Sequence, residues 1–81
     1  MIADLMFVAE KVWYENGMIC LIQSDKKEVR FPIHLNRKLR SATEQQLATI
    51  EIICGGTGFN WPDLDEDLSV IGILEGRYGK V

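Results

Sequence analysis

Hydrophobic and polar positions follow a β-strand pattern through the first part of the chain. Residues 6–14 are rich in aromatic and β-branched side chains, and residues 18–23 are apolar at almost every position. Residues 28–33 then alternate between apolar and polar, as a half-buried strand does. We therefore predict a three-stranded antiparallel meander over residues 6–34.

Turn-forming residues support this meander. Asn16 and Gly17 both tolerate a positive φ, and together they are a strong signal for a tight hairpin turn. Pro32 has no N–H to offer a neighbouring strand, so the third strand is predicted to lie at a sheet edge or to end there. Strict alternation in the first strand predicts two opposite faces, one with Phe7, Ala9, Lys11 and Trp13 and the other with Val8, Glu10, Val12 and Tyr14.

The middle of the chain changes to a helical pattern. Residues 35–40 suggest a single helical turn or a connector. Ser41 with Glu44 and Thr43 with Gln46 form two overlapping capping boxes. Leu47, Ile50 and Cys54 follow at helical spacing. We expect a helix over residues 44–52 that packs on one face of the sheet.

The last third begins with a glycine-rich turn over residues 55–58. Residues 59–61 are predicted to form a short strand, with Phe59 and Trp61 facing the core and Asn60 facing outward. Residues 63–67 form an acidic loop, and residues 68–75 have the spacing of a short helix. Ser69 is a candidate cap for that helix, Gly76 lies just past its end, and the remaining residues are predicted to be a polar tail.

These elements predict an α+β fold: a three-stranded antiparallel meander followed by a helix, a short strand and a short C-terminal helix. The chain has 81 residues, so we expect one domain over 1–81, with an ordered core over 5–76 and short flexible termini. A domain of this size has little interior to spare for a deep active site.

Composition narrows the function classes. The net charge of −3 argues against a general nucleic-acid binder, which usually carries a basic field. Cys20 and Cys54 both lie in apolar stretches and are expected to be buried, reduced thiols; with a single histidine they do not supply a zinc site. No targeting signal or membrane-length apolar run is visible, so we expect a cytoplasmic protein without a cofactor or a metal.

Several motifs together resemble a small bacterial family, domain of unknown function 2442. They are the strand end at residues 31–33, Leu39 with Ala42 and Thr43, and the long stretch over residues 58–70 that contains Trp61-Pro62. The resemblance covers about residues 12–76. It implies an α+β fold with a small antiparallel sheet, assigns no activity, and suggests a partner in a toxin–antitoxin-like pair. Lys26 departs from the family pattern, because a turn glycine is common there.

The acidic loop contains four candidate interaction residues, Asp63, Asp65, Glu66 and Asp67. Their spacing does not make a calcium loop, because Leu68 occupies the position where the sharp turn requires glycine. These carboxylates are expected either to stay solvated or to cap the helix that follows. In an interaction module they would face a basic surface on a partner.

Arg37, Lys38 and Arg40 form a basic cluster. Such a cluster can contact a nucleic-acid backbone, form a solvated helix face or neutralise a neighbouring acidic group. Trp61 is either an interface anchor or a core residue. We find no catalytic set, and the hypothesis we favour is a non-enzymatic module that binds another small protein. A nucleic-acid-associated regulatory domain that uses the basic cluster is the alternative.

Overall fold

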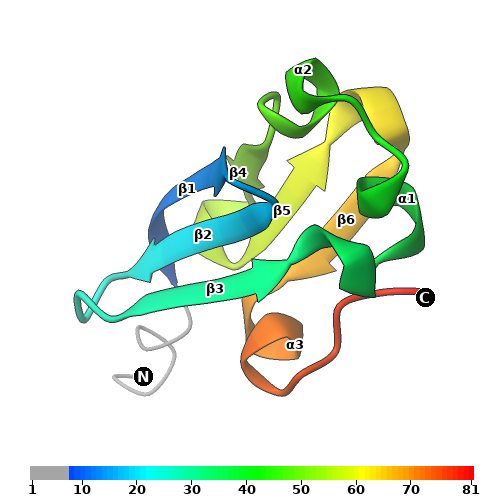
Figure 1. Ribbon diagram of the computed structural model, residues 1–81. Coiled ribbons are helices and arrows are strands. Elements are labelled where there is room, and N and C mark those ends of the chain that lie inside the picture. Colours follow the sequence, from blue (N-terminus) through cyan, green and yellow to red (C-terminus); the bar gives the residue numbers. More distant parts are fainter. Residues whose placement is uncertain (1–7) are drawn as a thin grey trace.

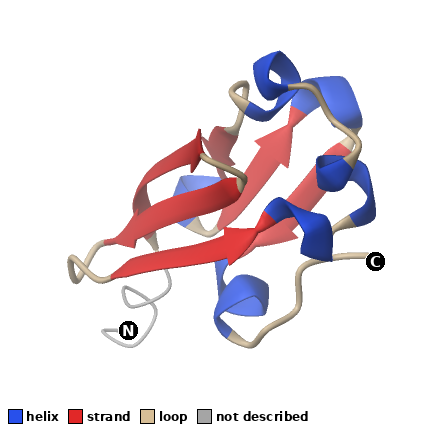
Figure 2. Cartoon of the chain, viewed as in Figure 1, coloured by secondary structure: helices blue, strands red, loops and turns tan. Residues whose placement is uncertain are grey.

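The protein consists of two three-stranded antiparallel sheets joined by short helical segments (Figure 1 and Figure 2). The computed structural model describes residues 8–81. The first sheet has the order β1-β2-β3 and the second the order β4-β5-β6. The strands are β1 (Ala9–Glu15), β2 (Met18–Gln23), β3 (Glu28–Pro32), β4 (Glu51–Ile53), β5 (Gly58–Trp61) and β6 (Glu66–Ser69). The helices are η2 (Ile33–Leu35), α1 (Arg37–Arg40), α2 (Glu44–Leu47), η3 (Cys54–Gly56), η4 (Pro62–Leu64) and α3 (Val70–Leu74).

The first sheet confirms the predicted meander. Asn16 and Gly17 adopt φ values of 50° and 80°, as the tight turn between β1 and β2 requires. Pro32 is the last residue of β3, opposite Met18. The N–H of Ile33 donates to the carbonyl of Gly17, and neighbouring residues of a ladder alternate in direction, so the nitrogen of Pro32 faces away from β2. The proline therefore lies on the outer edge of the sheet without loss of a ladder hydrogen bond.

A bulge in β1 overturns the strict alternation predicted for this strand. Ala9 pairs with Gln23, whereas Lys11 pairs with Ile22, so one extra residue is present in β1. The bulge moves Ala9 to the same side as Val12 and Tyr14, and all three contact the core. Phe7, which was predicted to share a face with Ala9, lies outside the described residues.

The helix expected over residues 44–52 ends after Leu47. The capping box of Thr43 and Gln46 is present, with each side chain bonded to the other residue's backbone N–H. Residues 51–53 pair with β5 instead of continuing the helix. The prediction was wrong there because β-branched residues at 49–53 favour a strand once a neighbouring strand satisfies their backbone.

The turn between β4 and β5 explains the glycine-rich segment. Gly55 and Gly56 adopt φ values of 66° and 100°, and a Cβ added to Gly56 would lie 2.5 Å from the side chain of Val8. Cys54 also has a positive φ and is exposed, so its predicted burial is wrong, whereas Cys20 is buried as expected. Lys26, the residue in place of a family turn glycine, has a φ of 74°.

The segment predicted as a helix over residues 68–75 is divided between β6 and α3. Leu68 belongs to β6 and pairs with Phe59. Ser69 is the predicted cap, because its side chain accepts a hydrogen bond from the N–H of Gly72. Gly76 follows the end of α3 with a φ of 82°. The α+β class is therefore confirmed, but the order of elements includes a second sheet that the sequence pattern did not predict.

The two sheets contribute to one hydrophobic core. The largest fully buried side chains of this core are those of Trp61, Phe31, Phe59, Ile19, Leu21, Leu39, Leu47 and Val70. Phe59 and Trp61 are 0% exposed and Asn60 between them is half-buried, which confirms the predicted orientation of β5. The indole nitrogen of Trp61 has no hydrogen-bond partner within residues 8–81. Trp61 is therefore a core residue and offers no surface to a partner.

Burial of Trp61 predicts a large loss of stability when its side chain is truncated. Trp61→Ala is expected to lower the free energy of unfolding by about 3–5 kcal/mol, a large part of what a small domain has. Asp65→Asn is the control, because Asp65 is exposed with a φ of 51°, which asparagine tolerates. It should change stability by less than about 0.5 kcal/mol. Urea unfolding curves measure both, and equal midpoints for Trp61→Ala and the unaltered chain would contradict the assignment.

Candidate interaction surface

Asn36 lies at the centre of the region where the candidate residues meet. Its side chain is 0% exposed and accepts a hydrogen bond from the N–H of Leu39 at 2.9 Å, which caps α1. Its Nδ2 donates to Glu66 Oε2 at 2.7 Å and to the carbonyl oxygen of Tyr78 at 2.6 Å. One buried amide therefore connects α1, β6 and the C-terminal residues.

Residues 77–81, for which we predicted a polar tail, are mostly exposed but make specific contacts with the rest of the protein. The ring of Tyr78 stacks on Phe31 with a centroid separation of 4.8 Å. The N–H of Arg37 donates to the carbonyl of Lys80 at 2.7 Å. A Cβ added to Gly79 would lie 2.6 Å from Asn36 Nδ2, so glycine is required for this close approach. We call residues 77–81 the C-terminal strap.

The acidic residues lie before and within β6, and none of them caps α3. Asp63, Asp65 and Asp67 are exposed, whereas Glu66 is half-buried against Asn36. The carboxylate of Asp67 accepts a hydrogen bond from the Nδ2 of Asn60. None of these four carboxylates forms an ion pair within residues 8–81. The negative charge of the three exposed aspartates is therefore available to a molecule at the surface.

The basic cluster lies beside the acidic residues. The ammonium of Lys38 donates to the carbonyl oxygen of Asp65 at 2.8 Å. Arg37, Lys38 and Lys80 line a hollow of about 390 Å³ together with Glu66 and Asp67. No local pattern in the sequence indicates that Lys80 joins the cluster, because only the fold brings the strap to α1. Arg40 instead donates to the carbonyl of His34 at 3.4 Å.

β6 has a free edge along the surface. The N–H of Val70 donates to the carbonyl of Thr57, and the register makes Leu68 and Glu66 the next residues bonded to β5. Because backbone groups alternate in direction along an antiparallel ladder, Asp67 and Ser69 direct theirs away from β5. The Ser69 carbonyl accepts the first hydrogen bond of α3, as the carbonyl of an N-cap residue does, so the open groups of this edge within residues 8–81 are the N–H and carbonyl of Asp67 and the N–H of Ser69.

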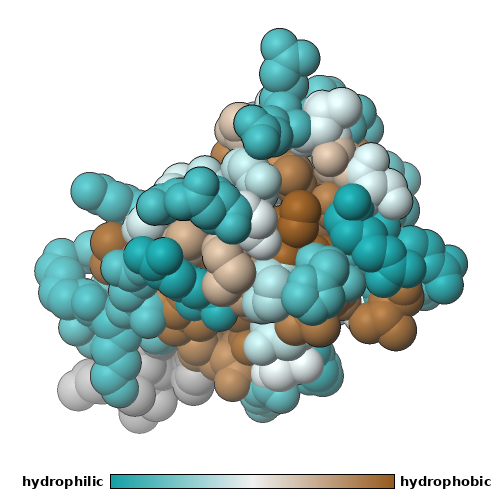
Figure 3. All heavy atoms as spheres, viewed as in Figure 1, coloured by the Kyte–Doolittle hydropathy of each residue, from teal (hydrophilic) through white to brown (hydrophobic). Residues whose placement is uncertain are grey.

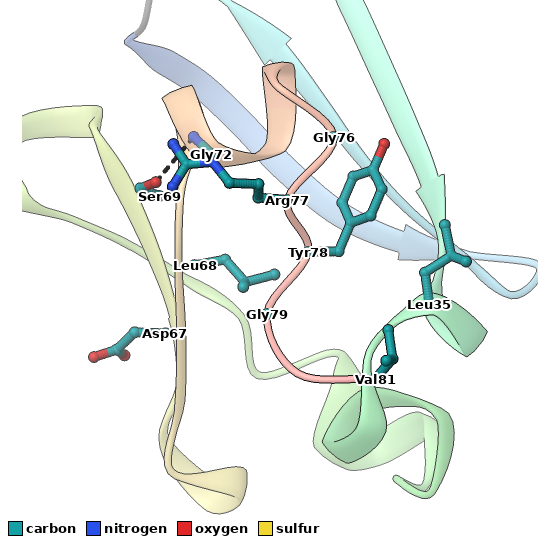
Figure 4. Close-up of a pocket in the computed structure, with 10 residues that line it drawn as sticks. All are labelled: Leu35, Asp67, Leu68, Ser69, Gly72, Gly76, Arg77, Tyr78, Gly79 and Val81. Carbon is teal, nitrogen blue, oxygen red and sulfur yellow. Dashed lines mark hydrogen bonds between the residues drawn. The ribbon is translucent and has the colours of Figure 1, made fainter.

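A groove of about 720 Å³ separates β6 from the C-terminal strap (Figure 4). Leu68 points into the groove from β6, while Asp67 points away from it (Figure 4). The apolar lining residues are Leu35, Leu68, Tyr78 and Val81. Hydrophilic side chains cover most of the face shown in Figure 3, and hydrophobic atoms are visible there only in small patches. The groove therefore combines apolar walls with the unpaired backbone of a strand.

The Cys20 thiol lies buried in β2. Burial raises the pKa of the Cys20 thiol, and the positive charge of Arg30 opposes this effect only in part. A buried thiol with a raised pKa stays protonated and is a poor nucleophile. Within residues 8–81, no three His, Cys, Asp or Glu side chains are placed to hold a metal ion. No helix in the same range has the length and apolar character to span a membrane.

The chain matches the family described as "Protein of unknown function (DUF2442)" over residues 9–79. It belongs to this family. No curated protein matches the chain.

Two solved structures share the DUF2442 fold seen here. The crystal structure of a protein of unknown function from Rhodospirillum rubrum ATCC 11170 has 31% sequence identity and a TM-score of 0.83, and the match covers 90% of each chain. The solution NMR structure of an uncharacterised protein from Chromobacterium violaceum has 36% identity and a TM-score of 0.78; the match covers 91% of this chain and 70% of that one.

The close approach of Gly79 to Asn36 can be tested with two glycine substitutions. Gly76 and Gly79 have φ values of 82° and 83°, but a Cβ at Gly76 would meet nothing within 4 Å. Gly76→Ala should therefore cost only the backbone strain of about 1–2 kcal/mol. Gly79→Ala should cost roughly 1–3 kcal/mol more because its methyl group displaces the strap. Equal losses in urea unfolding would show that the strap is not held against Asn36.

Proposed function

We propose that this chain is a non-enzymatic interaction module that binds another small protein through β6 and the C-terminal strap. The observation that carries the proposal is the free edge of β6 next to the groove of about 720 Å³. An unpaired edge is a template for pairing with another chain, and proteins usually cover or block such edges. In the first sheet, Pro32 blocks the corresponding edge of β3, whereas β6 contains no proline.

The charges around the groove favour a partner with a basic surface. Asp63, Asp65 and Asp67 are exposed and form no ion pair within residues 8–81. The cations nearby are already partly engaged, since Lys38 bonds the carbonyl of Asp65 and Arg77 pairs with Glu75. Exposed carboxylates of this kind increase the rate of encounter with a basic partner more than they increase the final affinity. A small cytoplasmic protein encoded beside this chain, as in an antitoxin–toxin pair, is the partner that we propose.

A nucleic-acid-associated regulatory role is the second candidate. It is favoured by the fold bringing Lys80 next to Arg37 and Lys38. Glu66 and Asp67 line the same hollow, however, and would repel a phosphate backbone. Binding to duplex or single-stranded DNA or RNA that weakens steeply with salt would support this candidate over protein binding.

The proposed function predicts that association depends on the exposed carboxylates. The test is co-expression with the product of the adjacent reading frame, followed by measurement of association and dissociation rates at low and physiological salt. Neutralising Asp63, Asp65 and Asp67 to asparagine should lower the association rate by about tenfold at low salt and leave dissociation nearly unchanged.

A matched control removes three other exposed carboxylates that form no ion pair within residues 8–81 and lie outside the sheet β4-β5-β6, with Glu15→Gln, Asp25→Asn and Glu44→Gln. This control has the same net charge as the test variant but keeps the carboxylates near β6. It should associate at nearly the rate of the unaltered chain. Recovery of the chain without any stoichiometric partner would contradict the proposed function, and equal effects of the two triple variants would contradict the role of this surface.

A further inference from the structure

We infer that the partner binds by strand addition: an extended segment with alternating basic and apolar residues pairs with the free edge of β6. This inference rests on the proposed function and specifies how the surface is used. The segment would become a fourth strand of the sheet β4-β5-β6. In this binding mode, backbone hydrogen bonds supply affinity and alternate side chains supply specificity.

The backbone of β6 supplies the hydrogen-bonding groups. Asp67 directs its N–H and carbonyl away from β5 and Ser69 directs its N–H the same way, as the register and the bond from Val70 to Thr57 require, whereas the Ser69 carbonyl is used by α3. The C-terminal strap does not use these groups. Its backbone bonds join other elements: the N–H of Arg77 donates to the carbonyl of Gly72, and the carbonyl of Lys80 accepts from the N–H of Arg37.

The two faces of β6 determine which side chains fit. Asp67 is exposed and shares its face with Asn60, to which it is bonded. Leu68 faces the opposite way, into the groove (Figure 4). A lysine or arginine of the added strand would therefore lie beside Asp67, and its neighbours along the strand would place apolar side chains in the groove.

The same charges argue against a second copy of β6 as the occupant. Two copies paired edge to edge would bring Glu66 and Asp67 of both chains together, and like charges on adjacent strands destabilise pairing. The added strand must instead carry the opposite charge. A basic, amphipathic strand from a different protein satisfies both the edge and the carboxylates.

The experiment uses an eight-residue peptide of alternating lysine and valine with capped ends and a fluorescent label. Its affinity for the full chain is measured by fluorescence anisotropy. A peptide of alternating glutamate and valine is the charge control, and a lysine–valine peptide with a central proline is the backbone control. We expect binding of the lysine–valine peptide, and at least about tenfold weaker binding of both controls.

Variants of the chain separate the backbone from the charge. Asp67→Ala removes the carboxylate but keeps the N–H, whereas Asp67→Pro also removes the N–H at the free edge without loss of a bond to β5. Asp67→Pro should bind the peptide about tenfold more weakly than Asp67→Ala. Arg30→Pro is the matched control, because Arg30 lies on the outer edge of β3 opposite Cys20, where its N–H faces away from β2. It should bind as the unaltered chain does.

Two results would overturn strand addition at β6. One is equal affinity of Asp67→Pro and Asp67→Ala; the other is an equal loss of binding in Arg30→Pro. If Asp67→Pro does not fold, amide chemical shifts of the unaltered chain decide: peptide addition must move the signals of Asp67 and Ser69 and leave Arg30 unchanged. If the native partner still co-purifies with Asp67→Pro, the proposed function stands and the binding mode is wrong.

Discussion

The buried side chain of Asn36 is the interaction on which the arrangement of this surface depends. It caps α1, bonds the carboxylate of Glu66 in β6 and bonds the backbone of Tyr78 in the C-terminal strap. A buried amide of this kind is stabilising only when its polar atoms are satisfied, and here both its oxygen and its nitrogen have partners. It ties α1 to two residues that lie 30 and 42 positions after Asn36 in the chain.

The hydrogen bonds that hold the C-terminal strap leave the outer edge of β6 open. Because the backbone of the strap bonds to α1 and α3, it does not pair with β6. The strap lies close to Leu68 at Gly79, yet the N–H and carbonyl of Asp67 and the N–H of Ser69 stay unpaired within residues 8–81. The fold thus keeps a strand edge open while packing the last residues of the chain. Exposed carboxylates beside the edge discourage self-association, as charged residues on edge strands generally do.

Short-range signals in the sequence predicted local structure well, and long-range pairing explains what they missed. The capping box of Thr43 and Gln46 was predicted and is present, but the helix it begins is short because residues 51–53 pair with β5. The spacing around Leu68 was typical of a helix, yet that residue pairs with Phe59. Strand pairing decides such segments, and no local pattern specifies it. The candidate surface could be predicted only as separate acidic and basic clusters for the same reason.

The most direct measurement of the central claim is amide hydrogen exchange in the free protein, resolved by residue with NMR. If the edge of β6 is open, the amides of Asp67 and Ser69 exchange rapidly, while those of Glu66 and Leu68, which face β5, are protected. Protection of Asp67 and Ser69 equal to that of Leu68 would show that the edge is already paired, and would contradict the account.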